Sequence, residues 1–221
     1  MKTIFLTGCT GDLGTSIYNR FKEEYNIIAP TRAELDLSNP ISIEIFFKKN
    51  NFQNIDVLIN NAGVNQLNNF IDITHEELIN TFNINTFSPL LITQEIIKRF
   101  FLQNKGGQII NIGTLWLSKI RAFRTTYGMS KAALEYLTKS IAIEFGEKNI
   151  ICNCISPGFI DTKLTRQNNS EIEINNISNN IPLKRLAQTN EITELINFLI
   201  NKNTYINGEN IYIDGGVSKN Y

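Results

Sequence analysis

Short apolar runs alternate with longer amphipathic stretches along the 221-residue chain. The apolar runs are rich in β-branched residues and occupy positions 3–7, 26–30, 55–60, 107–113, 150–156 and 209–214. Runs of this length and content indicate buried strands, and the stretches between them have the spacing of helices. The alternation predicts βαβ units in one domain spanning residues 1–221. Its expected fold class is α/β, a doubly wound, mostly parallel, Rossmann-like sheet with helices on both faces.

Two stretches depart from this alternation. After the run at 26–30 the chain passes at once through "TRAELDLSNP" to the helix-like "ISIEIFFKKN". This leaves no room for a full crossover helix, so one helix and one strand of the first half are expected to be abbreviated. Residues 163–180 combine charges, asparagines and isolated isoleucines. We predict that they form a mobile lid over the substrate.

The charge balance argues against several kinds of partner. The chain has 21 basic and 21 acidic residues and no net charge, so we expect neither a nucleic-acid nor a membrane partner. The apolar run Ile4-Phe5-Leu6 is too short for a signal-peptide core, and no later stretch is long enough to span a bilayer. A cytoplasmic protein is expected.

Cysteine and histidine give no metal or triad pattern. Cys9, Cys152, Cys154 and the single histidine, His75, lack the spacing of a zinc site, so we predict structural thiols and no bound metal. One histidine near a helix start offers no plausible base for a Ser-His-Asp triad.

A glycine-rich turn follows the first predicted strand and opens a helix. In "TGCTGDLG" the glycines Gly8, Gly11 and Gly14 are three residues apart. Glycines there permit positive φ and close approach of the backbone to a pyrophosphate, whose charge the helix N-terminus favours. Taken alone, such a turn also fits a purely structural role.

Tyr127 and Lys131 stand four residues apart in "YGMSK", which puts both on one face of a predicted helix. A phenol with a pKa near 10 is a poor acid or base at neutral pH. Lowering that pKa by about three units corresponds to roughly 4 kcal/mol of phenolate stabilisation. A nearby ammonium could supply it in a partly desolvated cleft. The alternative for this pair alone is an exposed amphipathic surface.

Several motifs together resemble the short-chain dehydrogenase/reductase (SDR) superfamily over nearly the whole chain. They are "TGCTGDLG", "NNAG" at 60–63, Asn85 in "NINTFSPLLITQ", "INIGT" at 110–114, "YGMSK", "ISPGFIDT" at 155–162, "IPLKRLA" at 181–187 and "NGENIYIDGG" at 207–216. The chain is similar to the short single-domain branch, in particular to 3-oxoacyl-[acyl-carrier-protein] reductases. In two places it departs from that branch. Asp12 stands where a middle glycine is usual, in a spacing typical of the extended sugar-nucleotide branch, and Thr114 stands where a serine is usual.

The resemblance implies a catalytic set. Tyr127 would be the general acid and base, and Lys131 would lower its pKa and hold the nicotinamide ribose. Thr114, 13 residues before Tyr127, would donate a hydrogen bond to the substrate oxygen. Asn85 would order a water molecule that restores the proton by way of Lys131.

The same resemblance implies a nicotinamide dinucleotide as cofactor. Its binding residues would also include Tyr127 and Lys131; the others are Gly8, Gly11, Asp12, Leu13, Gly14, Arg32, Asp36, Leu37, Asn61, Ala62, Gly63, Pro157, Gly158, Ile160 and Thr162. At the tip of the second strand a basic residue accommodates the 2′-phosphate of NADP, and a carboxylate binds the ribose of NAD. Arg32 therefore favours NADP(H) over NAD(H), with Glu34 as the residue that would reverse the preference.

These residues lead to one main functional hypothesis. It is hydride transfer between NADP(H) and a carbonyl or secondary alcohol, on a small-molecule or carrier-linked substrate such as a 3-oxoacyl thioester or a keto-sugar. The alternatives are a sugar-nucleotide epimerase or dehydratase and a non-catalytic dinucleotide sensor. Family likeness also implies a homodimer or homotetramer, formed through the helices that begin near Thr86 and near Tyr127.

Overall fold

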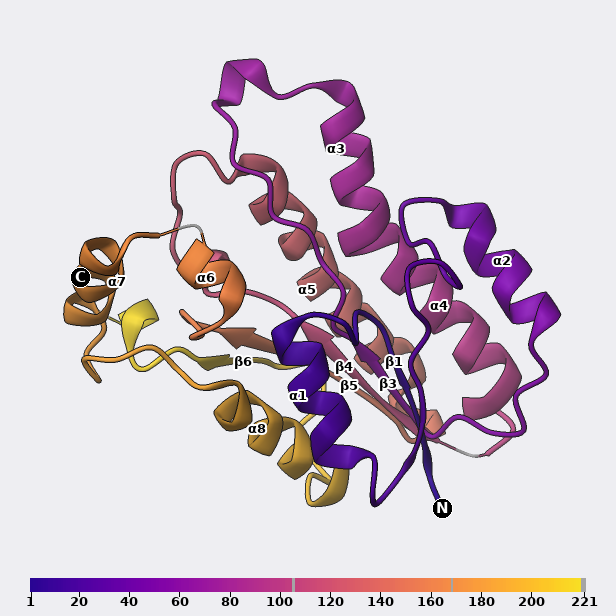
Figure 1. Ribbon diagram of the computed structural model, residues 1–221. Coiled ribbons are helices and arrows are strands. Elements are labelled where there is room, and N and C mark those ends of the chain that lie inside the picture. Colours follow the sequence, from indigo (N-terminus) through magenta and orange to yellow (C-terminus); the bar gives the residue numbers. More distant parts are fainter. Residues whose placement is uncertain (105, 168, 220–221) are drawn as a thin grey trace.

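The computed structural model describes residues 1–104, 106–167 and 169–219, and in these a six-stranded parallel sheet forms the centre of the molecule (Figure 1). The strands are β1 (Thr3–Leu6), β2 (Asn26–Ile28), β3 (Val57–Asn60), β4 (Gly107–Ile112), β5 (Ile150–Pro157) and β6 (Asn210–Ile213). Their order is β2-β1-β3-β4-β5-β6 and every neighbouring pair is parallel. Each strand coincides with one predicted apolar run, with β5 extending one residue beyond its run to Pro157, so the predicted fold class is confirmed.

The central strands are apolar because helices cover both of their faces. All four residues of β1 and of β3 are buried. Side chains of β1 alternate between the two sides of the sheet: Phe5 packs in one core, and Ile4 and Leu6 pack in the other. The edge strands β2 and β6 are only partly buried.

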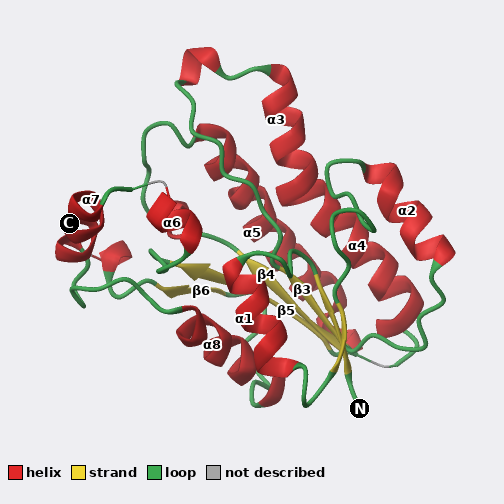
Figure 2. Ribbon diagram, in the orientation of Figure 1, coloured by secondary structure: helices red, strands yellow, loops and turns green. Residues whose placement is uncertain are grey.

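Two layers of helices enclose the sheet, which Figure 2 shows in yellow between them. On one face lie α1 (Asp12–Phe21) and α8 (Thr189–Asn201), which contact each other. On the other face lie α2 (Pro40–Lys49), α4 (Ser88–Ile96) and α5 (Thr125–Phe145). Helix α3 (His75–Phe82) leads into α4 through a π-helical turn, Asn83–Phe87, and a second such turn, Ile97–Phe101, follows α4.

The expected abbreviation of the first half is confirmed. Strand β2 ends at Ile28 and α2 begins at Pro40, with neither helix nor strand between them. The start of α2 is encoded locally: the Asn39 side chain accepts a hydrogen bond of 3.1 Å from the Ile41 N–H, and Pro40 occupies the first helical position.

The predicted lid contains two short helices, α6 (Lys163–Gln167) and α7 (Glu171–Asn180), and residue 168 lies outside the described residues. Helix α7 begins with a capping box in which Ser170 and Glu173 each bond the other's backbone N–H. Because capping specifies this helix without an apolar stripe, composition alone suggested an irregular segment. Its movement over a substrate stays a prediction.

Cys152 and Cys154 are unpaired thiols with no exposed surface, on strand β5. Burial raises the pKa of Cys154 to about 11, so this thiol stays protonated at neutral pH. Both cysteines serve as small core residues. No helix in the described part of the chain has the length and apolar content needed to cross a membrane.

Candidate active site

A cleft of about 570 Å³ opens at the carboxyl ends of the central strands. It lies where the chain, after β1, leaves to β2 on one side and returns to β3 on the other, and open α/β sheets bind ligands at such a switch point. Its lining includes the glycine turn, Pro30–Ser38 apart from residues 33 and 34, Asn61–Asn65, Tyr127, Lys131 and Thr162. The segments predicted to bind one cofactor therefore converge on one cleft.

A wider groove of about 900 Å³ lies beside α6, α7 and the start of α8. Its guanidiniums are already paired: Arg166 with Asp161 and Arg185 with Glu191, each at 2.7 Å. Since none of the predicted catalytic residues lines this groove, the switch-point cleft is the candidate active site.

The glycine turn is shaped by steric needs that differ among its glycines. A Cβ at Gly8, which has φ of +69°, would lie 2.8 Å from the Ala62 Cα, and a Cβ at Gly14 would lie 2.0 Å from the Gly8 carbonyl oxygen. A Cβ at Gly11 would have 3.8 Å of clearance from that same oxygen. Gly8 and Gly14 thus allow close packing, whereas Gly11, the N-cap of α1, leaves backbone accessible to a phosphate.

Asn61 holds the glycine turn in place. Its side-chain amide donates to the carbonyl oxygens of Thr7, at 3.1 Å, and Gly8, at 3.0 Å. The adjacent Gly63 provides space at the other end of the cleft. A Cβ there would lie 3.3 Å from Asn85 Oδ1 and 3.4 Å from Lys131 Nζ. Of the predicted segment, Asn61 therefore stabilises the glycine turn, and Gly63 leaves space beside the Lys131 ammonium.

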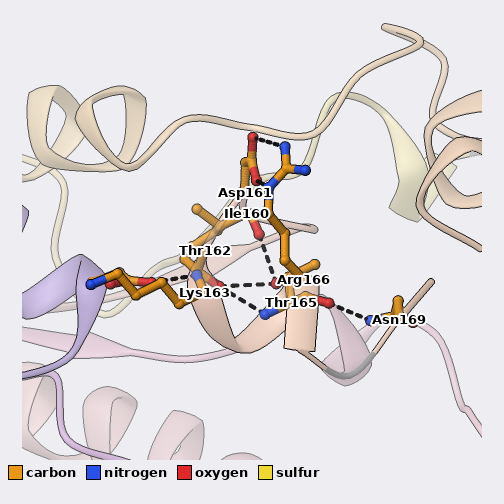
Figure 3. A network of polar contacts seen from close by, with 8 residues as sticks. Ile160, Asp161, Thr162, Lys163, Thr165, Arg166 and Asn169 are labelled. Carbon is orange, nitrogen blue, oxygen red and sulfur yellow. Dashed lines mark hydrogen bonds and ion pairs between the residues drawn. The ribbon is translucent and has the colours of Figure 1, made fainter. Parts of the chain in front are cut away.

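Asp12 connects the glycine turn to the predicted lid. Its carboxylate accepts a hydrogen bond of 2.5 Å from the backbone N–H of Lys163, the first residue of α6. Figure 3 shows the start of this helix, where Arg166 folds back onto Asp161 and the hydroxyls of Thr162 and Thr165 meet. Asp12 and Leu13 line the cleft, but the Asp12 carboxylate is bonded to the lid.

The tip of β2 presents an exposed guanidinium. The Arg32 side chain is 84% exposed, and its Nε lies 3.9 Å from the Asp36 carboxylate. Glu34 is held in its own turn by hydrogen bonds of 2.8 and 2.9 Å from the N–H and hydroxyl of Thr31. Asp36 and Leu37 line the cleft, and hydrogen bonds from Ser38 are the main cause of a lowered pKa of the Asp36 carboxyl.

Lys131 is the most buried cation of the site, with 3% of its surface exposed. Its Nζ donates a hydrogen bond of 2.7 Å to the Ile112 carbonyl oxygen at the end of β4. Burial lowers the pKa of this ammonium to about 8, against a smaller opposite effect of Cys154. Tyr127 lies one helical turn before it, and both line the cleft.

The environment of the phenol differs from the prediction. Burial is the main effect and raises the pKa of Tyr127, while a hydrogen bond with the Thr114 side chain and the charge of Arg124 lower it. Lys131, which was expected to lower this pKa, is not among these contributors, and its ammonium is bonded to the Ile112 carbonyl. Arg124 was not predicted as a site residue, because its effect on the phenol depends on how the loop before α5 folds.

Asn85 is fully buried in the π-helical turn between α3 and α4. Its Oδ1 accepts from the Val64 N–H at 2.9 Å, and its Nδ2 donates to the Val64 carbonyl at 2.9 Å and to the Ser130 hydroxyl at 3.0 Å. Asn85 thus fixes the segment after Gly63 against α5. π-Helical turns are common at functional sites, because the extra residue redirects a side chain. The predicted ordering of water by Asn85 remains untested.

Thr162 is the one residue predicted beside the nicotinamide that lines the cleft. Pro157, Gly158 and Ile160 lie behind it. Pro157 ends β5, and a Cβ at Gly158 would lie 2.7 Å from the Asp214 Cα, so this glycine allows close packing. Ile160 forms a parallel bridge with Ala187. These three residues carry Thr162 and α6 into position.

A cleft that passes from a glycine turn at a helix N-terminus to a half-buried phenol and a buried ammonium suits a dinucleotide whose reactive ring lies beside a proton donor. The protein is an NAD(P)-dependent oxidoreductase, a dehydrogenase or reductase. Residues 4–218 match the model of the family described as enoyl-(acyl carrier protein) reductase, so the chain belongs to this family of the SDR superfamily. The superfamily predicted from the motifs is confirmed.

Known proteins similar to this chain include reductases and dehydrogenases. The 3-oxoacyl-[acyl-carrier-protein] reductase of Buchnera aphidicola subsp. Baizongia pistaciae is 32% identical over 94% of this chain and 84% of its own. Carbonyl reductase family member 4 of Xenopus laevis is 32% identical over 82% of this chain and 75% of its own. The structure of a 4-hydroxyisoleucine dehydrogenase complexed with NADH matches with a TM-score of 0.93 and 28% identity over all of both chains. A mutant of that dehydrogenase was solved with NADH and succinate.

Proposed function

We propose that the protein reduces a ketone, or oxidises the corresponding secondary alcohol, with NADP(H), and that Tyr127 transfers the proton. The observation that carries this proposal is that Tyr127, hydrogen-bonded to the Thr114 side chain, lines together with Lys131 the cleft that also contains the glycine turn. The nicotinamide supplies or accepts the hydride when bound. Everything else in the reaction is assigned to side chains of this chain.

Each side chain has a defined task. Tyr127 protonates the carbonyl oxygen during reduction and removes the hydroxyl proton during oxidation. Thr114 donates a hydrogen bond to the same oxygen, and its bond with the phenol keeps the two groups together. Lys131, with its pKa lowered to about 8, can exchange a proton near neutral pH, and we assign it to the ribose and to resupply of the phenol.

The preference for NADP(H) over NAD(H) is supported by the β2 tip. The Arg32 side chain is largely free to meet a 2′-phosphate, and Glu34, the carboxylate that would favour a ribose diol, is occupied by Thr31. A screen of NADPH and NADH oxidation against a panel of ketones tests cofactor and reaction together. Absence of turnover with either cofactor on every ketone and alcohol would reject the proposed reaction.

The proposed reaction admits several classes of substrate, and similarity to known proteins supports particular ones. Similarity to a 3-oxoacyl-[acyl-carrier-protein] reductase supports a carrier-linked 3-oxoacyl thioester, and similarity to a 4-hydroxyisoleucine dehydrogenase supports a small hydroxy acid. A keto-sugar is a third candidate. Neither the epimerase nor the sensor alternative is favoured. Tyr127 and Lys131, whose loss would mark a non-catalytic sensor, are both present, and the similar proteins named above are reductases and dehydrogenases.

A lid role for residues 163–180 is supported by the position of α6, whose Leu164 lines the cleft next to Thr162. Helix α7 has no fully buried residue, so it contributes little to the core and could move at low cost. We propose that these helices close over the bound substrate.

We also propose a homodimer or homotetramer formed through α4 and α5. On α5 the exposed side chains of Met129, Tyr136 and Ile143 are 52, 74 and 85% exposed and seven residues apart, so they form one stripe. Phe87, just before α4, is also exposed. A second copy would cover this stripe. Light scattering at two protein concentrations, with Tyr136→Glu for comparison, distinguishes an oligomer from a monomer.

A further inference from the structure

Two arginines stack on the only tryptophan of the chain, next to the candidate catalytic residues. The guanidinium carbon of Arg121 lies 5.4 Å from the centre of the Trp116 ring, and that of Arg124 lies 5.3 Å from it. Trp116 also packs edge-on against Phe159 at 5.6 Å. We call Trp116, Arg121 and Arg124 the arginine subsite.

The two cations of this subsite have no close counter-ion. Among the described residues, no carboxylate oxygen lies within 4 Å of a nitrogen of Arg121 or Arg124. The Arg124 Nε is buried and has no hydrogen-bond partner there. Glu173 of α7 interacts with Arg121 only at longer range, because its carboxylate is bonded to Ser170.

The backbone makes the position of Arg124 still less favourable for an unpaired cation. Arg124 is the N-cap residue of α5, where the helix dipole is positive, and the first turn of α5 contains no acidic residue. Burial and the charge of Arg121 lower the pKa of the Arg124 guanidinium. A buried donor without a partner and two like charges at a helix N-terminus cost stability, and a bound anion would relieve both.

The subsite is adjacent to the proposed reaction centre. Arg124 precedes Tyr127 by three residues, and its charge is among the causes that lower the pKa of the Tyr127 phenol. Trp116 follows Thr114 by two residues, and the backbone N–H of Trp116 donates to the Thr114 hydroxyl at 3.4 Å. An anion held by Arg124 therefore lies within a short molecule's reach of the carbonyl that Tyr127 and Thr114 bind.

We propose that the arginine subsite binds the carboxylate of a short oxo acid, or of the corresponding hydroxy acid, and so selects acids over neutral ketones. The inference rests on the proposed reaction and specifies its substrate. The planar guanidinium of Arg124 can bond both oxygens of a carboxylate, and the Trp116 ring limits its movement. In the reaction the carbonyl carbon gains the hydride and its oxygen gains the proton of Tyr127, the nicotinamide is oxidised, and the carboxylate is unchanged.

Kinetics with matched substrates test the selection. We would measure kcat/KM for 4-oxopentanoate and for its methyl ester, with the uncharged thioester acetoacetyl-N-acetylcysteamine as a third substrate. The acid is expected to exceed its ester in the native protein. Arg124→Gln is expected to reduce the ratio of acid to ester about 10- to 100-fold, the loss of one charge-assisted pair, and Arg124→Lys to reduce it less. Lys22→Gln, an exposed change at the end of α1, is the control and should leave the ratio unchanged.

Fluorescence gives a readout that does not need turnover. Trp116 is the only tryptophan, so its emission reports directly on the subsite. Titration of 4-oxopentanoate into protein with oxidised cofactor should change this emission in a saturable way, and the ester should not. If Arg124→Gln does not fold, the same titration can be made with Arg121→Gln, a change at an exposed position.

The outcomes separate the two proposals. Preference for the ester or the thioester, with an acid-to-ester ratio that Arg124→Gln leaves unchanged, overturns the oxo-acid proposal and leaves the proposed reaction intact. Saturable binding of the acid at Trp116 without reduction of any ketone overturns the proposed reaction and supports the anion subsite.

Discussion

The carboxylate of Asp12 accepts its hydrogen bond from the backbone N–H of Lys163, a residue 151 positions away in the chain. Asp12 is the first residue of α1 and Lys163 is the first residue of α6, so the segment that would touch the cofactor phosphates is also bonded to the start of the predicted lid. We therefore expect Asp12→Ala to free α6 and α7. Loss of such a contact between a carboxylate and a helix N-terminus is expected to cost about 1 kcal/mol locally.

Hydrogen exchange measures this directly. Amides of residues 163–180 should exchange faster in Asp12→Ala, while those of β3 and β4 should be unaffected. Asp12→Asn retains an acceptor oxygen and serves as the matched control. Equal protection of α6 in native and Asp12→Ala protein would contradict the connection.

Tyr127 is the proposed proton donor of the reaction. Tyr127→Phe is expected to reduce kcat about 10²- to 10⁴-fold, because general acid-base catalysis is lost and the ring is kept. Cofactor affinity, measured by fluorescence titration, and the melting temperature should change little. Tyr18→Phe, on the exposed side of α1, should keep full activity. A Tyr127→Phe protein with near-native kcat would remove the proposed role.

Lys131 is expected to reduce the stability of the folded protein at neutral pH. Its pKa is lowered to about 8 by burial, so the unfolded chain binds more protons than the native chain between about pH 8 and the ordinary lysine pKa near 10.4. The contribution of Lys131 to stability is therefore least favourable below pH 8 and improves as the pH rises through this interval.

Comparison with Lys131→Met isolates this effect. At pH 7 the variant should be more stable by about 1–3 kcal/mol, since the buried charge is removed although the bond to Ile112 is lost too. The difference should narrow toward pH 10, as denaturant unfolding at several pH values would reveal. An inactive variant with no gain at pH 7 would show that the hydrogen bond outweighs the cost of burial.

Arg32 should decide between the two nicotinamide cofactors. Arg32→Ala is expected to raise KM for NADPH about 10- to 100-fold and to leave KM for NADH almost unchanged, because only NADPH has the 2′-phosphate. Arg20→Ala, an arginine on α1 that pairs with Glu24 and Glu194, is the control for loss of a surface charge. An equal change for both cofactors would argue against recognition of the phosphate.

Gly11 and Gly14 should respond differently to the same added methyl group. In Gly14→Ala the methyl would lie 2.0 Å from the Gly8 carbonyl oxygen, so the free energy of unfolding should fall by at least about 2–3 kcal/mol. In Gly11→Ala the backbone, with φ of −78°, accepts alanine and the nearest atom is 3.8 Å away. This variant should fold normally and lose cofactor affinity. Thermal unfolding and cofactor titration of both variants give the comparison.

Much of the fold could be predicted because each of its signals is local. The six strands were found because each is a short β-branched run bounded by polar residues, and even the three-residue β2 lies within such a run. The pair Tyr127 and Lys131 was found because four residues make one helical turn. In α7, by contrast, helix formation depends on the capping box of Ser170 and Glu173, which a search for apolar periodicity misses.

The parts of the site that could not be predicted depend on contacts between distant segments. The partner of Asp12 is a backbone group on the far side of the cleft, which no spacing rule identifies. The effects of Arg124 on Tyr127 and Trp116 depend on how the loop before α5 folds back. The bond from Lys131 to the Ile112 carbonyl forms only because the end of β4 lies beside α5, which a sequence pattern does not specify.

The short connection after β2 affects how molecules of this protein can associate with one another. It leaves β2, with three residues, as one outer strand of the sheet, and β6, with four, as the other. Strands this short present few unpaired N–H and C=O groups, so they offer little to a strand of a neighbouring molecule. The reduced sheet therefore stays protected from edge-to-edge aggregation, and association is left to the helical surfaces.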